Sequence, residues 1–259
     1  MKKILKCIGF ILLLAAIMYA VTGILPFILS SIIPNEDDLY SLSGSLGTIA
    51  AAITAVLMTS SPGDLTSVKN FSVPKALILM VLCLCVNKIL FESFMGSIMC
   101  HLLPKEEFTD RAPTIITLLT SIVMAPVAEE FLFRRGIFLF MKREVGKITA
   151  YIVSSLLFMI CHGIDPETMV GTFTAGLVFA MIFEHTHNIW YSVLVHMGYN
   201  IFAKVSNAVT RAGIPMHRDI NGYCVNHLYV ITIAVVITGV IVFILMKARQ
   251  HHEEDPGSR

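Results

Sequence analysis

Long apolar stretches separated by short polar turns run through most of the chain. A membrane-spanning helix needs roughly 17–25 mostly apolar residues, and eight stretches approach or exceed that length. We expect the first to be broken near Pro26, and the fifth is short. The predicted spans are residues 4–33, 43–59, 76–103, 114–141, 148–162, 168–183, 189–205 and 227–246. The polar segment 34–38 is predicted to be a turn, and the second span, rich in Ala and Gly, to pack closely against its neighbours.

Composition supports this pattern. The 259 residues are 56% hydrophobic and 14% charged, and the mean hydropathy is +0.77. A soluble domain is nearer 45–50% apolar and about 25% charged. We therefore predict an all-α polytopic membrane protein of about eight transmembrane helices. A single transmembrane domain would cover residues 1–246, with a hydrophilic cytoplasmic tail over 247–259. The lipid bilayer would be the partner of such a protein, and the net charge of +1 predicts no nucleic-acid partner.

The distribution of basic residues predicts an orientation, because cytoplasmic loops carry an excess of Lys and Arg. Most basic residues near span ends fall on one side if both termini are cytoplasmic. They are Lys2, Lys3, Lys69, Lys75, Lys142, Arg143, Lys147, Lys247 and Arg249. We expect an integral protein of a bacterial cytoplasmic membrane, with both termini in the cytoplasm.

The fourth span contains four adjacent or nearly adjacent charges, Glu129, Glu130, Arg134 and Arg135, inside an otherwise apolar segment. One such charge at mid-bilayer costs at least about 2.5–3.5 kcal/mol, so the charges need partners or a use. Glu130 and Arg134 are four apart in the favourable order for a helical ion pair, and Glu129 lies about 100° away around the helix. We interpret Glu130–Arg134 as a structural clasp and Glu129 as the free, functional carboxylate. The alternative is that all four charged side chains lie near a helix end and extend to the membrane–water interface.

Three polar residues in later spans join this carboxylate in the prediction. His162 closes the fifth span, four residues after Phe158, and His196 and Asn200 are four apart on one face of the seventh. At a rise of 1.5 Å per residue, Glu129 lies about 16–18 Å, His162 about 21 Å and His196 about 12 Å from the cytoplasmic end of its helix. Similar depth on different spans is expected of one intramembrane site. Either histidine alone could instead be an ordinary packing or interhelical hydrogen-bonding residue.

These residue types suit peptide hydrolysis. Glu129 could act as general base on a water that His162 also holds, and His196 and Asn200 could donate hydrogen bonds to the oxyanion. A metal site is the competing chemistry: Glu129, His162 and His196 form a possible zinc-ligand set, with Asn200 beside it. The sequence contains no HExxH or GxSxG motif, which argues against a zincin helix and a serine nucleophile elbow.

Three motifs in these residues resemble a known family. Glu129-Glu130-Phe131-Leu132-Phe133-Arg134 resembles the EExxxR motif of the CPBP family, the CAAX-protease and bacteriocin-processing membrane enzymes also called Abi. Segments 158–162 and 196–200 resemble its FxxxH and HxxxN motifs. Together they cover about residues 114–205, which would form the motif-bearing core.

The resemblance implies an eight-helix intramembrane endopeptidase, similar to the Ras-converting CAAX prenyl protease, with its active site inside the helix bundle. It assigns water activation to Glu129 and His162 and the oxyanion to His196 and Asn200; Glu130, Arg134 and Phe158 would support the site. The family has been described both as metalloproteases and as metal-free, glutamate-dependent enzymes. We favour no cofactor, with zinc as the alternative. The substrate would be a prenylated CAAX-type protein, a leader peptide or a signalling peptide. A non-catalytic protein of the same fold, conferring bacteriocin immunity or binding a peptide, is the runner-up.

Overall fold

A computed structural model describes residues 2–59, 71–87, 112–163 and 166–211. Every regular element within these ranges is a helix, which confirms the all-α prediction. The elements are α1 (Lys2–Leu29), α2 (Glu36–Thr59), α3 (Val73–Cys83), α5 (Ile115–Leu119), η3 (Thr120–Met124), α6 (Ala125–Glu130), η4 (Phe131–Phe138), α7 (Leu139–Val145), α8 (Lys147–Cys161), α9 (Pro166–Thr186) and α10 (Ile189–Arg211). The end of the predicted third span, the eighth span and the tail lie outside the described residues.

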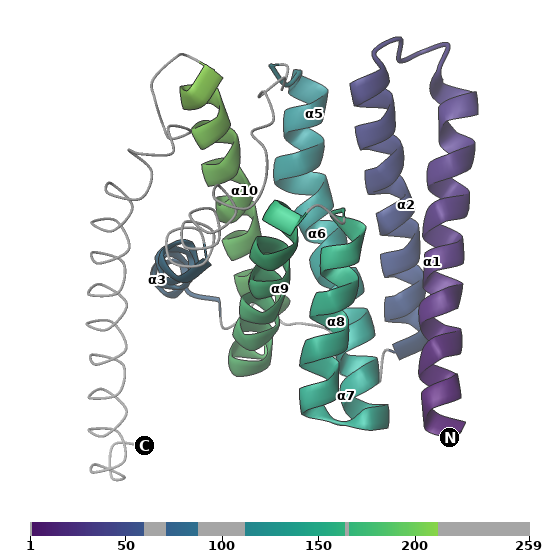
Figure 1. Cartoon of the computed structure of the whole chain (residues 1–259), viewed down its shortest axis with the longest axis vertical. Helices are drawn as coiled ribbons and strands as arrows, with labels where there is room; N and C mark the ends of the chain where they lie inside the picture. Colours follow the sequence, from purple (N-terminus) through teal and green to yellow (C-terminus); the bar gives the residue numbers. More distant parts are fainter. Residues whose placement is uncertain (1, 60–70, 88–111, 164–165, 212–259) are drawn as a thin grey trace.

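Three long helices form one side of the bundle. In the described ranges α1, α2 and the continuous run from α5 to α7 (Ile115–Val145) are long and apolar enough to cross a membrane. Figure 1 shows α1 rising from the N-terminus, α2 returning beside it, and the α5–α7 run descending next to α2. Helices α8, α9 and α10 pack on the other side of this run. The prediction of a polytopic helical membrane protein is confirmed.

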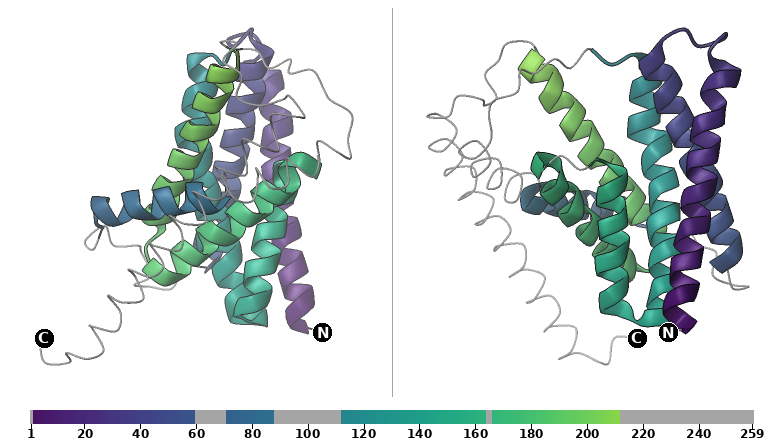
Figure 2. Two further views of the ribbon diagram at one scale, coloured as in Figure 1. Left: turned by 60° about the vertical axis from the view of Figure 1, so that its left-hand side comes forward. Right: turned by 45° about the vertical axis from the view of Figure 1, so that its right-hand side comes forward.

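The described part of the predicted third span and the fifth span differ from simple crossings. Helix α3 lies across the bundle instead of along it, and α8 and α9 form a hairpin whose turn sits about halfway up (Figures 1 and 2). With 15 residues, α8 is only about 22 Å long at 1.5 Å per residue. The turn that carries His162 therefore lies about halfway along the bundle.

Two predicted boundaries near the N-terminus were wrong. Helix α1 is not broken at Pro26 but continues to Leu29; the proline lies close to the helix end, so few turns follow it. Helix α2 begins at Glu36 rather than at residue 43, and the predicted polar turn supplies its first helical turn. The Asn35 side chain accepts a hydrogen bond from the backbone N–H of Asp38 at 3.0 Å, and acidic residues are favoured at a helix N-terminus.

Small residues let α2 approach both of its neighbours, as the sequence predicted. A side chain at Gly47 would come within 2.2 Å of the Thr22 hydroxyl on α1, and one at Gly136 within 2.5 Å of Ala55. Such close contact between backbones is how helices associate in membranes, where apolar surface alone gives little driving force. The packing fixes α2 against η4, directly beside the paired glutamates.

Candidate active site

The two glutamates end a short α-helical segment that lies between two π-helical turns, η3 and η4. π-Turns inside longer helices are rare and frequently mark functional sites. In η3 the backbone N–H of Ala125 bonds to the carbonyl of Thr120, five residues earlier. The next residue is Pro126, which has no N–H to donate. The Ser121 carbonyl therefore lacks a backbone donor five residues along the chain, and its partner comes from another helix.

That partner is Asn200 on α10, whose side-chain Nδ2 donates to the Ser121 carbonyl at 2.8 Å. The contact satisfies a backbone acceptor that the π-turn and the proline leave open. It also holds α10 against the fourth span. A carboxamide carries two N–H hydrogens, so this bond leaves one for other use. Asn200 is thus tied to the wall of the site.

Glu130 is fully buried and makes three polar contacts. Its carboxylate pairs with Arg134 Nε at 3.2 Å, accepts from Ser192 Oγ at 2.5 Å, and contacts His196 Nδ1 at 2.9 Å. The predicted clasp with Arg134 is present in the structure. Because the other two partners lie on α10, Glu130 also joins this helix to the fourth span.

Arg134 lies in an aromatic enclosure. Its guanidinium carbon is 4.6 Å from the ring centre of Phe158 and 5.3 Å from that of Phe179, and Nη2 donates to the Gly176 carbonyl at 3.2 Å. Cation–π attraction is strongest when the cation is removed from water, and Arg134 is 1% exposed. Phe179 also stacks on the His196 ring, with centres 4.6 Å apart. Phe158 and Phe179 therefore both enclose Arg134, and the role of Phe158 as a support of the site stays a prediction.

Glu129 faces the two predicted histidines. Its Oε2 lies 3.6 Å from His162 Nε2 and 3.7 Å from His196 Nε2, and this oxygen is buried without a hydrogen-bond partner. Three helices thus bring one carboxylate and two imidazoles together, as the depth argument predicted. The side chain of His196 is 2% exposed and that of His162 is 31% exposed, so the site is open on the His162 side.

The other nitrogen of each imidazole determines the tautomer. Nδ1 of His162 lies 2.8 Å from the Phe158 carbonyl, and Nδ1 of His196 contacts the Glu130 carboxylate. Both partners only accept hydrogen bonds, so both Nδ1 atoms must donate. In its neutral form each histidine then directs the Nε2 lone pair toward Glu129. The site presents acceptors that a water molecule or a cation would satisfy.

The same donor set is chemically that of a Glu-His-His zinc site, in which carbonyl or carboxylate groups commonly fix the far nitrogen of each histidine. As the side chains lie in the described ranges, no three His, Cys, Asp or Glu groups form a metal-ligand cluster. Zinc binding would require Glu129, His162 and His196 to close around the ion.

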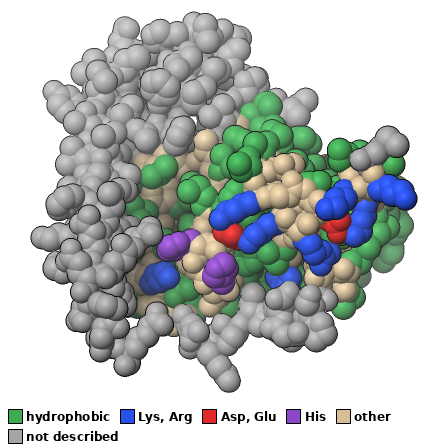
Figure 3. Space-filling view, turned by 90° about the horizontal axis from the view of Figure 1, so that it is seen from below, with side chains coloured by type: hydrophobic (Ala, Val, Ile, Leu, Met, Phe, Trp, Pro, Cys, Tyr) green, Lys and Arg blue, Asp and Glu red, His purple; other side chains and the backbone are tan. Residues whose placement is uncertain are grey.

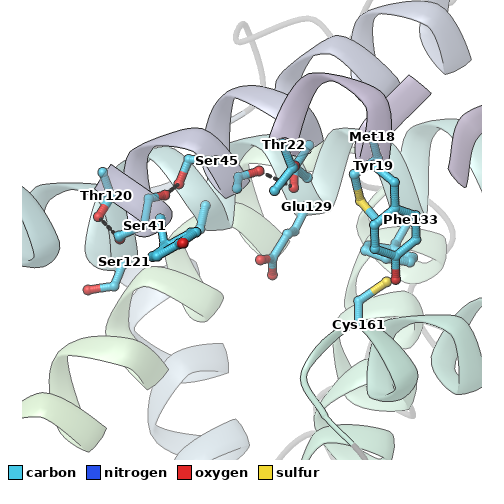
Figure 4. Close-up of a pocket in the computed structure, with 14 residues that line it drawn as sticks. Met18, Tyr19, Thr22, Ser41, Ser45, Thr120, Ser121, Glu129, Phe133 and Cys161 are labelled. Carbon is cyan, nitrogen blue, oxygen red and sulfur yellow. Dashed lines mark hydrogen bonds between the residues drawn. The ribbon is translucent and has the colours of Figure 1, made fainter. Parts of the chain in front are cut away.

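A cavity of about 340 Å³ adjoins Glu129. Figure 4 shows Ser41, Thr120 and Ser121 toward one end of it, Glu129 near the middle, and Tyr19 and Cys161 at the other end. Its walls come from α1, α2, the fourth span and the end of α8. The volume is in the lower part of the range of ligand sites, which is about 300–1,000 Å³.

Sequence reasoning missed Ser192 and Phe179. Ser192 could have been found, because it lies four residues before His196 and so extends the His196–Asn200 face by one turn. Phe179 lies in an apolar stretch with Phe173 and Phe183 nearby, and nothing in the sequence distinguishes it from them.

Comparison with known proteins gives a family match and a related membrane protein. Residues 111–202 match the family described as type II CAAX prenyl endopeptidase Rce1-like. The Bacillus subtilis (strain 168) protein YdiL, a candidate membrane peptidase, is 27% identical over 90 residues; the match covers 35% of this chain and 36% of YdiL. No solved protein structure matches this chain with significance. Segment 111–202 of this chain is therefore similar to the Rce1-like CAAX prenyl endopeptidase family of membrane proteases, and the matched part of YdiL is little more than a third of that protein.

Proposed function

We propose that this protein is an intramembrane endopeptidase that hydrolyses a peptide bond through a water activated by Glu129. The observation that carries the proposal is the convergence of His162 Nε2 and His196 Nε2 on the otherwise unpartnered Oε2 of Glu129. A water bound there would donate to Glu129 and to His162 Nε2. Its oxygen would then be held and polarised for attack.

In the reaction the water oxygen forms a bond to the scissile carbonyl carbon while Glu129 takes a proton from the water. The carbonyl oxygen becomes an oxyanion. When the C–N bond breaks, the proton held by Glu129 passes to the leaving nitrogen, which gives an acid and an amine. Overall, one water molecule is consumed for each peptide bond that is cleaved.

His196 and Asn200 would stabilise the oxyanion. Nδ1 of His196 already donates to Glu130, so Nε2 carries a hydrogen only when the ring is doubly protonated. Asn200 retains one N–H beyond the one bound to Ser121. Preorganised donors of this kind are worth about 10²–10³ in rate each.

The substrate would be a membrane-associated peptide or protein: a CAAX-type prenylated protein, a leader peptide or a signalling peptide. Zinc is the alternative means of activating the water, held by Glu129, His162 and His196. A non-catalytic role in bacteriocin immunity or peptide binding is the alternative from another functional class, and it needs neither an activated water nor Glu129.

The deciding experiment is cleavage of a peptide library by purified protein, with and without a metal chelator, beside the Glu129→Gln variant. We expect cleavage that survives the chelator and disappears in the variant. Cleavage lost with the chelator, together with stoichiometric zinc by elemental analysis, would replace the metal-free mechanism. Absence of any cleavage, with peptide binding retained, would favour the non-catalytic alternative.

A further inference from the structure

The cavity beside Glu129 lies in one half of the bundle. Helix α1 rises from the N-terminus and lines the cavity with Met18, Tyr19 and Thr22, which lie in its C-terminal half. Helix α2 descends from the α1–α2 turn and lines the cavity from Tyr40 to Thr48, in its N-terminal half. Both sets lie in the halves of α1 and α2 that are nearer to that turn. The cavity therefore lies mainly in the half of the bundle that is farther from the N-terminal end, and Glu129 is near its middle.

In the opposite direction, buried side chains of the fourth span lie between Glu129 and the N-terminal end. Phe133 forms part of the cavity wall, and Ile137, Phe138 and Met141, further along the same span, are 4%, 0% and 4% exposed. Phe138 packs against Tyr151 and against the ring of Phe183. These side chains separate Glu129 from the N-terminal end of the bundle.

Ion pairs tie the helices together beyond this apolar layer. Lys142 Nζ pairs with Glu184 at 2.8 Å, and Lys6 Nζ pairs with Glu144 at 2.5 Å. The first pair joins α7 to α9, and the second joins α1 to α7. They hold the N-terminal end of the described bundle closed.

The two ends differ in charge. Lys and Arg side chains gather on the N-terminal end (Figure 3), where Lys6, Lys142 and Lys147 lie. The first turn of α2, at the other end, carries Glu36 and Asp37. Because cytoplasmic ends of membrane proteins are enriched in Lys and Arg, the N-terminal end is assigned to the cytoplasm and the cavity to the outer half of the membrane.

The cavity walls select for an uncharged occupant. They are rich in hydroxyl groups, including Tyr19, Thr22, Ser45 and Thr48, and Glu129 is the one charged residue among those lining them in the described part of the chain. The hydroxyls of Ser45 and Thr48 donate to carbonyls of their own helix, so toward an extended peptide they can accept from its N–H groups. Apart from Glu129, which the proposed reaction uses as its base, no lining group in the described part of the chain would compensate a buried charge on the substrate.

We infer that the active site is supplied from the non-cytoplasmic half of the membrane, and that its substrate is an uncharged, extended peptide segment reaching the site from that side. The identification of the occupant as a substrate rests on the proposed endopeptidase function. The side of the membrane from which the cavity is reached can be measured without any activity.

The test is labelling of single cysteines by a membrane-impermeant maleimide, in spheroplasts and in inverted vesicles. The background is a chain in which all six native cysteines are replaced by Ala. Thr48→Cys reports on the cavity, the exposed Asp37→Cys on the outer end and the exposed Lys147→Cys on the N-terminal end. We expect Thr48→Cys to be labelled from the same side as Asp37→Cys. Labelling from the side of Lys147→Cys, or from neither side, would overturn the inference.

If the cysteine-free chain does not fold, the native chain provides the same measurement, because Cys161 lines the cavity and is exposed. Its labelling is located by mass spectrometry, with Cys161→Ala as the control. The side from which Cys161 is modified supports or overturns the inference as before.

A matched pair of substitutions tests whether the substrate occupies the cavity. The hydroxyls of Thr48 and Thr54 on α2 each donate to the carbonyl four residues earlier, at 2.9 and 3.0 Å, but only Thr48 lines the cavity. We expect Thr48→Leu to raise KM about tenfold or more, because it fills space that the peptide needs. Thr54→Leu should leave KM unchanged. Equal effects of the two variants on KM would overturn the inference that the substrate occupies the cavity. Absence of cleavage by the wild-type protein would instead contradict the proposed function.

Discussion

The adjacent glutamates should respond in opposite ways to the same substitution. Glu130→Gln keeps the shape of the side chain but removes the charge that faces Arg134 Nε at 3.2 Å. Its amide also cannot accept from both Ser192 and His196 as the carboxylate does. Breaking a buried ion pair by removing one partner costs about 3–5 kcal/mol. For a chain of this size 1 kcal/mol shifts Tm by about 2–4 °C, so we expect Tm to fall by roughly 6–20 °C.

Glu129→Gln is the control, because it makes the same chemical change one residue earlier. Glu129 Oε2 has no hydrogen-bond partner in the described structure, so this variant should retain the wild-type Tm within about 2 °C and lose cleavage completely. The assay is thermal unfolding of detergent-purified protein, read together with peptide cleavage. Equal losses of Tm in the two variants would refute the division into a structural and a functional carboxylate.

Two further predictions concern topology and the oxyanion. Reporter fusions after Arg259 and within the α1–α2 turn at Asn35 should report opposite sides of the membrane, with the C-terminus cytoplasmic; matching reports would remove the assigned orientation. Asn200→Ala should lower kcat by about 10²–10³-fold with little change in KM, because the oxyanion exists only in the transition state. A loss of about 10–100-fold in Asn200→Ala, accompanied by zinc in the wild type that His196→Ala releases, would indicate a metal site instead.

The helical periodicity of the chain was enough to predict which residues meet. Glu130–Arg134 follows from a spacing of four, and the convergence of Glu129 with His162 and His196 follows from similar depth on separate helices. These are local or one-dimensional properties, and a sequence contains them directly. The mixed polarity of the fourth span was informative because each buried charge in a membrane needs a partner.

The details that the sequence did not predict depend on contacts between helices. The π-turns arise where the fourth span accommodates Pro126 and its neighbours, and they change which carbonyl is left for Asn200. Helix α8 ends about halfway along the bundle, so His162, which follows its last residue, reaches Glu129; the hydropathy of the fifth span alone predicts a short crossing. The start of α2 at Glu36 depends on a cap by Asn35, which outweighs the polarity of the segment.

The net charge of the proposed site does not change when the water is activated. Glu130 is paired with Arg134 throughout. When Glu129 takes a proton, its charge is transferred to the oxyanion, so the net charge of the buried site does not change. This matters in a membrane, where an uncompensated charge is costly. Besides stabilising the fold, Glu130 therefore has a second role in the reaction, which is to hold His196.

The double variant Glu130→Gln/Arg134→Met separates the two roles of Glu130. Removing both members of a buried pair is far less damaging than removing one, so Tm should recover most of the loss seen in Glu130→Gln, as a double-mutant cycle would measure. Cleavage should stay low, because His196 still lacks the carboxylate that accepts from its Nδ1 and fixes the orientation of its ring. Full recovery of cleavage together with Tm would show that Glu130 serves the fold alone.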